Sequence, residues 1–368
     1  MISAKTPRRA GATGLACLTT EARETAMAMM SAHPAPVPSR AVQGILCIEV
    51  AMLLFVAQDA VMKGLLSSYP VWPLLFARSV VAVLVLVPLI AMLGGPHSLR
   101  SALWPLHMAR AFLFAAGFSM FYAAFPFMGL AEVSTIFFSA PLMTALMAAL
   151  FLGERVGAHR AAALVVGFAG VVIAMNPMGG QFSWASVLPL LCALTYAASQ
   201  ILARRIGERE STLTVGLYTL SFSGLMIVPI GWLVARLLPL APETAHLRWG
   251  LPEGVWADLP RLAGLGAIGM VAYMLASRAY QVASASLVAP FDYTYLPFAA
   301  LLGYLVWAEV PGPATLTGMV LIIGAGLYIG WRELRAARRG DATPVTAEAT
   351  FAPGSPLPPQ MPEEERAP

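Results

Sequence analysis

Long apolar runs alternate with short polar turns along almost the whole chain. Ten runs have the roughly 20 residues that a helix needs to cross a bilayer. They cover 43–64, 70–94, 104–126, 130–152, 158–175, 184–204, 212–236, 259–280, 284–307 and 312–331. Two such runs could be buried core helices of a soluble protein, but ten could not. The pattern therefore predicts an all-α polytopic membrane protein with ten transmembrane helices.

The composition agrees with a chain embedded in a lipid bilayer. The 368 residues have a mean hydropathy of +0.73, and 58% of them are hydrophobic. Only 11% are charged, far below the roughly 25% of soluble domains. The three cysteines, Cys17, Cys47 and Cys192, form no close pair in the sequence, so neither a disulfide framework nor a metal site is expected. No residue pattern predicts a cofactor.

Polar segments flank the apolar part of the chain. Residues 1–41 lack the apolar core of a signal peptide and predict a disordered cytoplasmic tail. The alternative is a mis-assigned start, with the true one at a methionine between 27 and 30, so that residues 1–29 would not belong to the protein. Residues 334–368 are rich in Pro, Ala and Glu and cannot bury enough apolar surface to fold, which predicts a second disordered cytoplasmic tail.

The net charge of +4 does not predict binding to nucleic acid, because the basic residues are not gathered into one patch. They sort by loop instead. Lys and Arg precede the first span and follow the second, fourth, sixth and tenth, whereas the loops "GLLSSYP", "PFMG", "NPMGGQFS" and "VPGP" contain none. By the positive-inside rule both termini are cytoplasmic. The loop 237–258 is assigned to the outer side although it carries Arg248, and its length and its acidic residues weaken this exception.

The two halves of the chain resemble each other. "SAPLMTALMAALFLGE" (139–154) aligns with "TYLPFAALLGYLVWAE" (294–309), and "YAAFPFMGLAEVSTI" aligns more weakly with "YMLASRAYQVASASL". The chain therefore divides into two five-helix repeats, 42–176 and 177–333, and because five is odd the second repeat enters the membrane from the opposite side. Inverted repeats are typical of secondary transporters, whose substrate site lies near the midplane between the halves and which work by alternating access. A duplication without a transport role is the alternative.

Several stretches are similar to the EamA family of the drug/metabolite transporter superfamily. They include "FARSVVAVLVLVP", "GLAEVSTIFFSAPLMTALMAALFLGERVG", "APFDYTYLPFAALLGYLVWAEVPGP" and "GAGLYIGWRE", and the resemblance covers both halves. It implies a carrier of amino acids, nucleosides, vitamins or other metabolites in a bacterial inner membrane, and it specifies neither the substrate nor the direction of transport. An Asp and a Lys that close the first span, with an Arg in the second, are most similar to the branch of S-adenosylmethionine and riboflavin carriers.

Two charged residues fall near mid-membrane, where each costs about 2.5–3.5 kcal/mol and is therefore a functional hypothesis. Asp292, in "PFDYTYLP", lies about 12 Å from the start of the ninth span in a core of about 30 Å. Arg78 reaches a similar depth from the outer side. We predict that Asp292 holds a cationic group of the substrate or takes up a coupling proton, and that Arg78 fixes a carboxylate or phosphate. A buried Asp292–Arg78 pair, or hydrogen bonds from tyrosines, that only locks the helices is the alternative.

Other charges lie nearer the membrane surfaces. Asp59 and Lys63 are four apart on one face of the first span, which permits a local ion pair that would act as a gate or as a stabilising contact. Glu132 opens the fourth span at the outer surface and is a third candidate for this gate. Arg110 lies within about two turns of the cytoplasmic end of the third span, from which its side chain can snorkel. Glu309 ends the ninth span and predicts a cap or an interface contact.

Aromatic side chains are candidates for the wall of the same site. Tyr122, Tyr273, Tyr293 and Tyr295 could line a cavity for a flat or cationic ligand; packing or anchoring at the membrane interface is the alternative for each. Further aromatic candidates are Trp72, Phe121, Tyr196 and Tyr218. The glycines of "GLYIG" (326–330) permit close helix contact, either in a homodimer or within the bundle.

Rival classes of membrane protein lack their signatures. The histidines fall in tails, loops or span ends and no HExxH motif occurs, so no catalytic residue or metal ligand is predicted and an enzyme is not expected. Neither lysine stands in a GxxxxGK[ST] motif, which excludes an ATP-driven pump on this chain alone. An oligomeric channel, with a ring of carbonyls or charges at its pore, and a non-transporting structural membrane protein remain as alternatives. We therefore expect a secondary transporter for a small polar or zwitterionic organic metabolite, with protons as one candidate for coupling.

Overall fold

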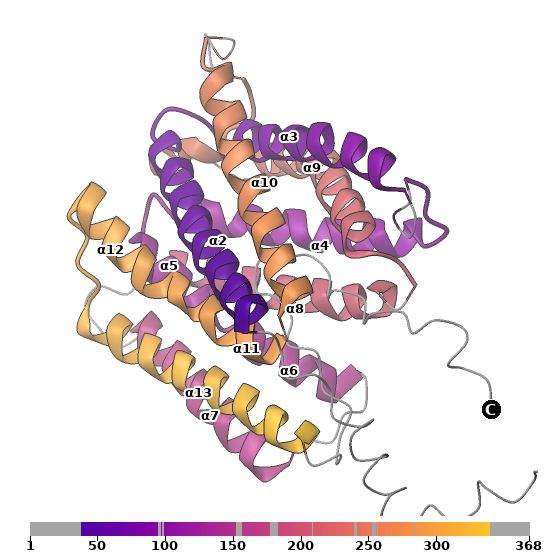
Figure 1. The fold of residues 1–368 in the computed structure, drawn as a ribbon. Helices are drawn as coiled ribbons and strands as arrows, with labels where there is room; N and C mark the ends of the chain where they lie inside the picture. Colours follow the sequence, from indigo (N-terminus) through magenta and orange to yellow (C-terminus); the bar gives the residue numbers. More distant parts are fainter. Residues whose placement is uncertain are drawn as a thin grey trace, which may run out of the picture.

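The computed structural model describes residues 38–94, 97, 99–151, 157–176, 183–207, 209–238, 241–251, 255, 257–283 and 285–338. Within these ranges the chain is helical and forms no strands (Figure 1). The α-helices are α2 (Pro38–Leu65), α3 (Val71–Leu93), α4 (Trp104–Ala123), α5 (Leu130–Phe137), α6 (Ala140–Phe151), α7 (Ala158–Met175), α8 (Val187–Gly207), α9 (Thr212–Leu237), α10 (Leu259–Val282), α11 (Ala285–Val288), α12 (Tyr295–Trp307) and α13 (Pro313–Arg338). The described residues also form three short 3-10 helices: η1 (Trp184–Ser186), η2 (Pro242–Leu247) and η3 (Ala289–Thr294).

Eight helical segments of the described chain are long and apolar enough to cross a membrane, with α5 and α6 counted as one. So many apolar segments identify a multi-pass membrane protein. The two other predicted spans differ from these eight. Helix α4 has 20 residues but carries His107 and Arg110, and α12 has only 13 residues.

The helix ends correct the predicted limits of the two tails. Helix α2 begins at Pro38, inside the predicted tail 1–41, because a proline in the first helical turn needs no backbone hydrogen-bond partner. Helix α13 runs on to Arg338, beyond the predicted boundary at 333, because the segment continues with strong helix formers and ends in arginines. The remainder of both predicted tails lies outside the described residues.

One helix in each half is interrupted. The predicted span 130–152 divides into α5 and α6 at Phe138 and Ser139, and the span 284–307 divides into α11, η3 and α12. Pro290 lies in the first turn of η3, where the missing backbone N–H favours a break. A 3-10 segment inside a longer helix often marks a functional hinge. Asp292 lies in this segment.

The principal helix contacts join one half of the chain to the other. Helix α2 packs along α10, α4 along α8, α3 along α9 and α7 along α13 (Figure 1). Glycines bring α7 and α13 close enough for their backbones to touch: a Cβ atom at Gly318 would lie 2.5 Å from the carbonyl oxygen of Gly170. The interface between the halves therefore runs through the middle of the bundle.

Candidate functional site

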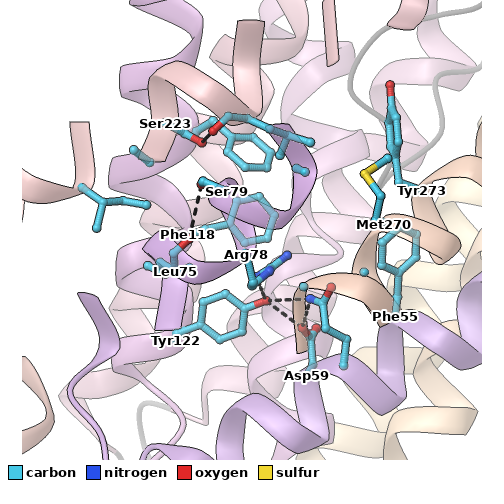
Figure 2. A pocket seen from close by; sticks show the side chains of 18 residues that line it. Phe55, Asp59, Leu75, Arg78, Ser79, Phe118, Tyr122, Ser223, Met270 and Tyr273 are labelled. Atoms are coloured by element: carbon cyan, nitrogen blue, oxygen red, sulfur yellow. Dashed lines mark hydrogen bonds between the residues drawn. The ribbon is translucent and has the colours of Figure 1, made fainter. Parts of the chain in front are cut away.

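A cavity of about 80 Å³ lies at this interface (Figure 2). Its walls come from α2, α3 and α4 of the first half and from α9 and α10 of the second. One water needs about 10–15 Å³, so the cavity has room for several waters. The polar lining residues are Gln58, Asp59, Arg78, Ser79, Tyr122, Ser223 and Tyr273, and aromatic rings of Phe55, Phe114 and Phe118 form much of the rest.

Asp59 on α2 supplies a buried carboxylate to this cavity. Asp59 is only 3% exposed, and both of its carboxylate oxygens accept hydrogen bonds from tyrosines. The Tyr122 hydroxyl of α4 donates to Oδ1 at 2.7 Å, and the Tyr295 hydroxyl of α12 donates to Oδ2 at 2.6 Å. Gln58 Nε2 adds a longer contact to Oδ1 at 3.4 Å. Such bonds to an ionised acceptor are short and strong, and here they fix the carboxylate between three helices.

Arg78 on α3 is the cation of the cavity. One of its terminal nitrogens, Nη1, donates to the Tyr122 hydroxyl, and its guanidinium carbon lies 5.3 Å from the centre of the Tyr122 ring. The single proton of that hydroxyl goes to Asp59, so the oxygen accepts from Arg78. Figure 2 shows the hydroxyl between the two charged groups. A guanidinium has five N–H donors, and within the described chain only Nη1 of Arg78 has a hydrogen-bond partner, so most of its donors are available to a ligand.

Small residues on α10 allow the helices of the cavity to approach. A Cβ atom at Gly269 would lie 1.7 Å from the amide oxygen of Gln58, and one at Gly266 would lie 2.6 Å from Val81. Both contacts are far below normal van der Waals distance. The glycines therefore seat α10 directly against the residues beside Asp59 and Arg78.

The aromatic residues of α4 hold Tyr122 in place. The Phe121 ring packs against Phe125 and Phe137 with centroids 5.1 and 5.2 Å apart, and the Tyr122 ring lies 5.2 Å from that of Phe121. Edge-to-face packing of this kind adds to the burial of the rings. It fixes the Tyr122 hydroxyl between Asp59 and Arg78.

The structure brings some of the predicted site residues together and leaves others apart. Arg78, Tyr122 and Tyr273 line the cavity, and Tyr295 reaches it through Asp59. The hydroxyl of Tyr273 also donates to the carbonyl of Thr212 at 3.2 Å, which ties α10 to α9.

Asp292 and Tyr293 are not among the residues that line the cavity. Asp292 is 2% exposed and accepts a hydrogen bond from the Tyr280 hydroxyl of α10 at 3.0 Å. Tyr293 packs against Phe138, and its hydroxyl lies against Gly326 of α13, so this glycine is used within the bundle. The acid that lies beside Arg78, through Tyr122, is thus Asp59 rather than Asp292.

The predicted local pair of Asp59 and Lys63 is not formed. Lys63 is bonded to the carboxylate of Glu309 and donates to the carbonyl oxygen of Met128 at 2.9 Å. The other oxygen of Glu309 accepts from the backbone N–H of Leu130 at 2.9 Å. Lys63 lies one turn further along α2 than Asp59, where its ammonium group reaches an acid of the other half. Glu309 thus contacts the first half of the chain through both of its carboxylate oxygens.

Glu132, the third predicted gate residue, caps α5. Its Oε2 accepts from the backbone N–H of Gly129 at 3.1 Å. With Lys63, Glu309 and Trp307 it also lines a second, more open cavity of about 420 Å³. This cavity lies at the end of the bundle where α2 ends and α5 begins.

Further contacts close the same end of the bundle. The Tyr69 hydroxyl, after α2, donates to Asp258 before α10, and this carboxylate raises the pKa of Tyr69 above its ordinary value. Trp72 Nε1 donates to the carbonyl of Leu247 at 2.9 Å. Both contacts join the first half of the chain to the second.

Arg110 does not snorkel, in contrast to the prediction. It is fully buried between α4, α8 and α9, where its guanidinium donates to the carbonyl of Ser199 and to Gln200, both at 3.2 Å, and to Thr219. Oxygens of the neighbouring helices thus take the place of water. One turn earlier on α4, His107 Nε2 lies 2.9 Å from Glu210, which precedes α9. No pattern in the sequence indicated these cross-helix partners.

Comparison with known proteins shows similarity to membrane transporters. The EamA-like transporter family matches residues 42–176 and again 183–331. A riboflavin transporter of Rhizobium johnstonii is 31% identical over 307 residues, which cover 82% of this chain and 95% of that protein. An S-adenosylmethionine uptake transporter of Rickettsia felis is 25% identical over 283 residues, covering 77% and 90%. A pseudopaline exporter of Pseudomonas aeruginosa is 27% identical over 283 residues, covering 77% and 94%.

Proposed function

Because the chain belongs to the EamA-like transporter family, we propose that it is a secondary transporter that moves a small polar or zwitterionic organic metabolite across the bacterial inner membrane by alternating access. The observation that carries this proposal is the cavity between the halves, where Asp59 and Arg78 face each other among aromatic rings. Charged groups inside a membrane bundle are costly and are kept for ligands, ions or protons. Such a site at the interface of two repeats is the arrangement expected of a carrier.

The packing of the helices supports two inverted repeats, 42–176 and 177–333, with ten spans. When the helices are compared by their order within each repeat, α2 corresponds to α8, α3 to α9, α4 to α10 and α7 to α13. Exchanging the repeats then turns the α2–α10 contact into the α8–α4 contact and leaves the α3–α9 and α7–α13 contacts unchanged. A two-fold axis that relates the halves would likewise leave the set of helix contacts unchanged when the halves are exchanged. In this arrangement α4 and the interrupted α11–η3–α12 segment are the two additional spans, and Arg110 is shielded from lipid by α8 and α9.

The distribution of Lys and Arg supports cytoplasmic termini. With this orientation the Lys63–Glu309 pair lies at the outer end of the bundle and the His107–Glu210 pair at the cytoplasmic end. Contacts between the halves therefore exist on both sides of the cavity. Alternating access requires that these two sets of contacts open in turn.

The walls of the cavity favour a ligand with a flat ring and a polar group. Aromatic rings can stack on the ring, and Arg78 can hold a carboxylate, phosphate or carbonyl oxygen. Riboflavin and S-adenosylmethionine, the compounds named for two relatives, both combine a heteroaromatic ring with hydrogen-bonding groups. A cavity of about 80 Å³ is smaller than the roughly 300–1,000 Å³ of ligand pockets, so the halves must separate to admit either compound.

The other proposed roles follow from position. Tyr122, Tyr273 and Tyr295 shape the site, Lys63 and Glu132 belong to the outer gate, and the ligand or proton role of Asp292 stays a prediction. A homodimer also stays a prediction; Gly330 faces open space on α13 and leaves room for a second helix. The family and the relatives point to a transporter rather than an enzyme.

Counterflow in proteoliposomes tests the proposal and separates a carrier from a channel. Vesicles that contain the full chain are loaded with unlabelled riboflavin or S-adenosylmethionine, and entry of the labelled compound is followed. A carrier accumulates label transiently above equilibrium, whereas a channel or a structural protein does not. We expect counterflow with at least one of the compounds, its loss in Arg78→Gln, and its retention in Glu49→Gln, which changes a carboxylate of α2 outside the cavity lining. Absence of counterflow with both compounds would reject this ligand class.

A further inference from the structure

The two charges of the cavity are linked by one hydroxyl group. Tyr122 donates to Asp59 and accepts from Arg78, so neither charge can change without affecting the hydrogen bonds of the other. Among the described residues, the other groups that interact with Asp59 are neutral. Tyr295 of α12 bonds its second oxygen, Tyr273 of α10 and Gln58 line the same cavity, and Cys192 of α8 lies buried nearby.

Arg78 is the cation that compensates Asp59. Two further cations lie near this region. Lys63 on the same helix α2 is bonded to Glu309 and to the Met128 carbonyl. Arg110 of α4, close to Tyr273, donates to Ser199, Gln200 and Thr219. Arg78 and Asp59 face a cavity with apolar and aromatic walls, where opposite charges interact far more strongly than in water. The pair is neutral as a whole, and an added charge would upset that balance.

We propose that the cavity binds its ligand through a carboxylate group on the free donors of Arg78, and that Asp59 takes up one proton when the ligand binds. This inference rests on the proposed transport function and specifies its ligand and its coupling. The ligand carries a carboxylate, and the transported unit is this ligand together with one proton. Asp59, rather than Asp292, is the coupling group.

The proton balance follows from charge. A carboxylate on Arg78 cancels the charge that had favoured ionised Asp59, so a proton from water adds to one Asp59 oxygen. No covalent bond other than this O–H bond forms or breaks. The net charge of the cavity stays at zero, because one negative charge and one proton enter together.

Tyr122 transmits the change. While Asp59 is ionised, the Tyr122 proton points to it; once Asp59 carries a proton, it donates to the Tyr122 oxygen. The Tyr122 proton then turns toward the carboxylate on Arg78. The bound carboxylate thus gains the Tyr122 hydroxyl as a further donor only when Asp59 is protonated, and by linkage the ligand and the proton strengthen each other's binding.

Infrared spectroscopy of the purified full chain tests the charge link without a ligand. In the wild type near neutral pH we expect no carboxylic acid band from Asp59, because the charge of Arg78 compensates an ionised carboxylate. In Arg78→Gln the compensating charge is lost, and we expect a protonated carboxylic acid C=O band that disappears in Arg78→Gln/Asp59→Asn. Arg78→Lys keeps the positive charge and should, like the wild type, show no carboxylic acid band. This variant is the control that separates loss of the charge from the general effect of replacing Arg78. If Arg78→Gln gives no such band, Asp59 does not depend on Arg78 and the inference is overturned.

A pair of flavins tests the ligand class. Lumiflavin and 10-carboxymethylflavin share a ring system and differ in one carboxylate, which stays ionised between about pH 5.5 and 8. We expect the wild type to bind the carboxylated flavin more tightly as the pH falls, by up to about tenfold per pH unit for one linked proton. Asp59→Asn imitates the protonated state and should bind the carboxylated flavin tightly at every pH. Glu49→Gln should keep the pH dependence of binding that the wild type shows.

The outcomes separate this inference from the proposed function. Counterflow of neutral riboflavin, together with a carboxylated flavin that binds no better at low pH, would retain the transporter and reject the proton-linked anion site. An unchanged pH dependence in Asp59→Asn would also reject it. If neither flavin binds, the flavin class fails, and the infrared result alone decides the link between Arg78 and Asp59.

Discussion

The ammonium group of Lys63 on α2 is bonded to the carboxylate of Glu309, which follows α12 in the other half of the chain. The Lys63 ammonium also lies 5.2 Å from the centre of the Trp307 ring. The side chains of Lys63 and Glu309 are only 10% and 27% exposed, so water screens the pair weakly. The pair fastens the two halves together one turn beyond Asp59 and lines the more open cavity at this end.

We predict that Glu309→Gln opens this end of the protein more often. Loss of the carboxylate leaves Lys63 buried without its counter-ion, which favours the state in which water reaches it. The measurement uses Ser79→Cys, in the wall of the central cavity, in a chain whose Cys17, Cys47 and Cys192 are replaced. A membrane-impermeant maleimide added from outside should label this thiol several-fold faster in Glu309→Gln.

A charge exchange provides the control for the gate. Lys63→Glu combined with Glu309→Lys restores opposite charges and should return labelling toward the wild-type rate, whereas Lys63→Glu alone should not. Equal labelling rates in the wild type and in Glu309→Gln would show that the pair does not control access to the cavity.

We predict that Tyr295→Phe destabilises the protein. The substitution removes one of the two tyrosine hydrogen bonds to a buried carboxylate, a loss of about 1–3 kcal/mol. The matched change Tyr304→Phe, on the same helix at a residue that is 56% exposed, should have little effect. Thermal unfolding of both variants in detergent compares them. Equal melting temperatures would mean that Asp59 does not need the Tyr295 hydroxyl.

The contact between α7 and α13 predicts different responses at two glycines of one helix. A methyl group at Gly318 meets backbone atoms of Gly170 and Ala174 at 2.5 and 2.9 Å, which cannot move without shifting α7. Gly318→Ala should therefore lower the melting temperature and the yield of folded protein. Gly324→Ala meets nothing within 4 Å and should be neutral or slightly stabilising, because alanine favours a helix. A lower melting temperature for Gly324→Ala than for Gly318→Ala would contradict the packing of these helices.

Asp292 and Tyr280 form the contact that ties η3 to α10, and we predict that they act as a unit. Asp292→Asn and Tyr280→Phe should each lower the melting temperature, and the double variant should lose less than the sum of the two, as expected of interacting residues. Counterflow assays of the same variants examine the role of Asp292 predicted from the sequence. A ligand role requires that Asp292→Asn abolishes exchange while Tyr280→Phe retains it. A proton role requires that Asp292→Asn removes the pH dependence of exchange while Tyr280→Phe keeps it.

The positions of the spans could be predicted because they follow from apolar length alone. The predicted span 158–175 coincides with α7, and most others end within a few residues of the observed helices. The breaks after Phe137 and before Tyr295 could not be placed, since hydropathy continues through them. Only the prolines nearby hinted at an interruption.

The candidate site was predicted less well, because its bonds join residues far apart in the sequence. Depth in the membrane drew attention to Arg78, and this residue lines the cavity; its role in binding stays a prediction. For Asp59 the local spacing suggested Lys63, whereas its bonds come from Tyr122 and Tyr295, on helices whose packing no local pattern reveals. Isolation in an apolar segment drew attention to Asp292, but isolation in the sequence does not show which way a side chain points.

Protection of a cavity thiol by a transported compound tests most directly the claim that Asp59 and Arg78 face the substrate site. The chain with Ser79→Cys as its single cysteine is labelled with and without whichever of riboflavin and S-adenosylmethionine shows counterflow. A thiol at Ser67→Cys, in the outer cavity, serves as the reference. We predict that the compound slows labelling at residue 79 several-fold and leaves residue 67 unchanged. Equal labelling at residue 79 with and without a compound that the protein exchanges would contradict the assignment of this cavity as the substrate site.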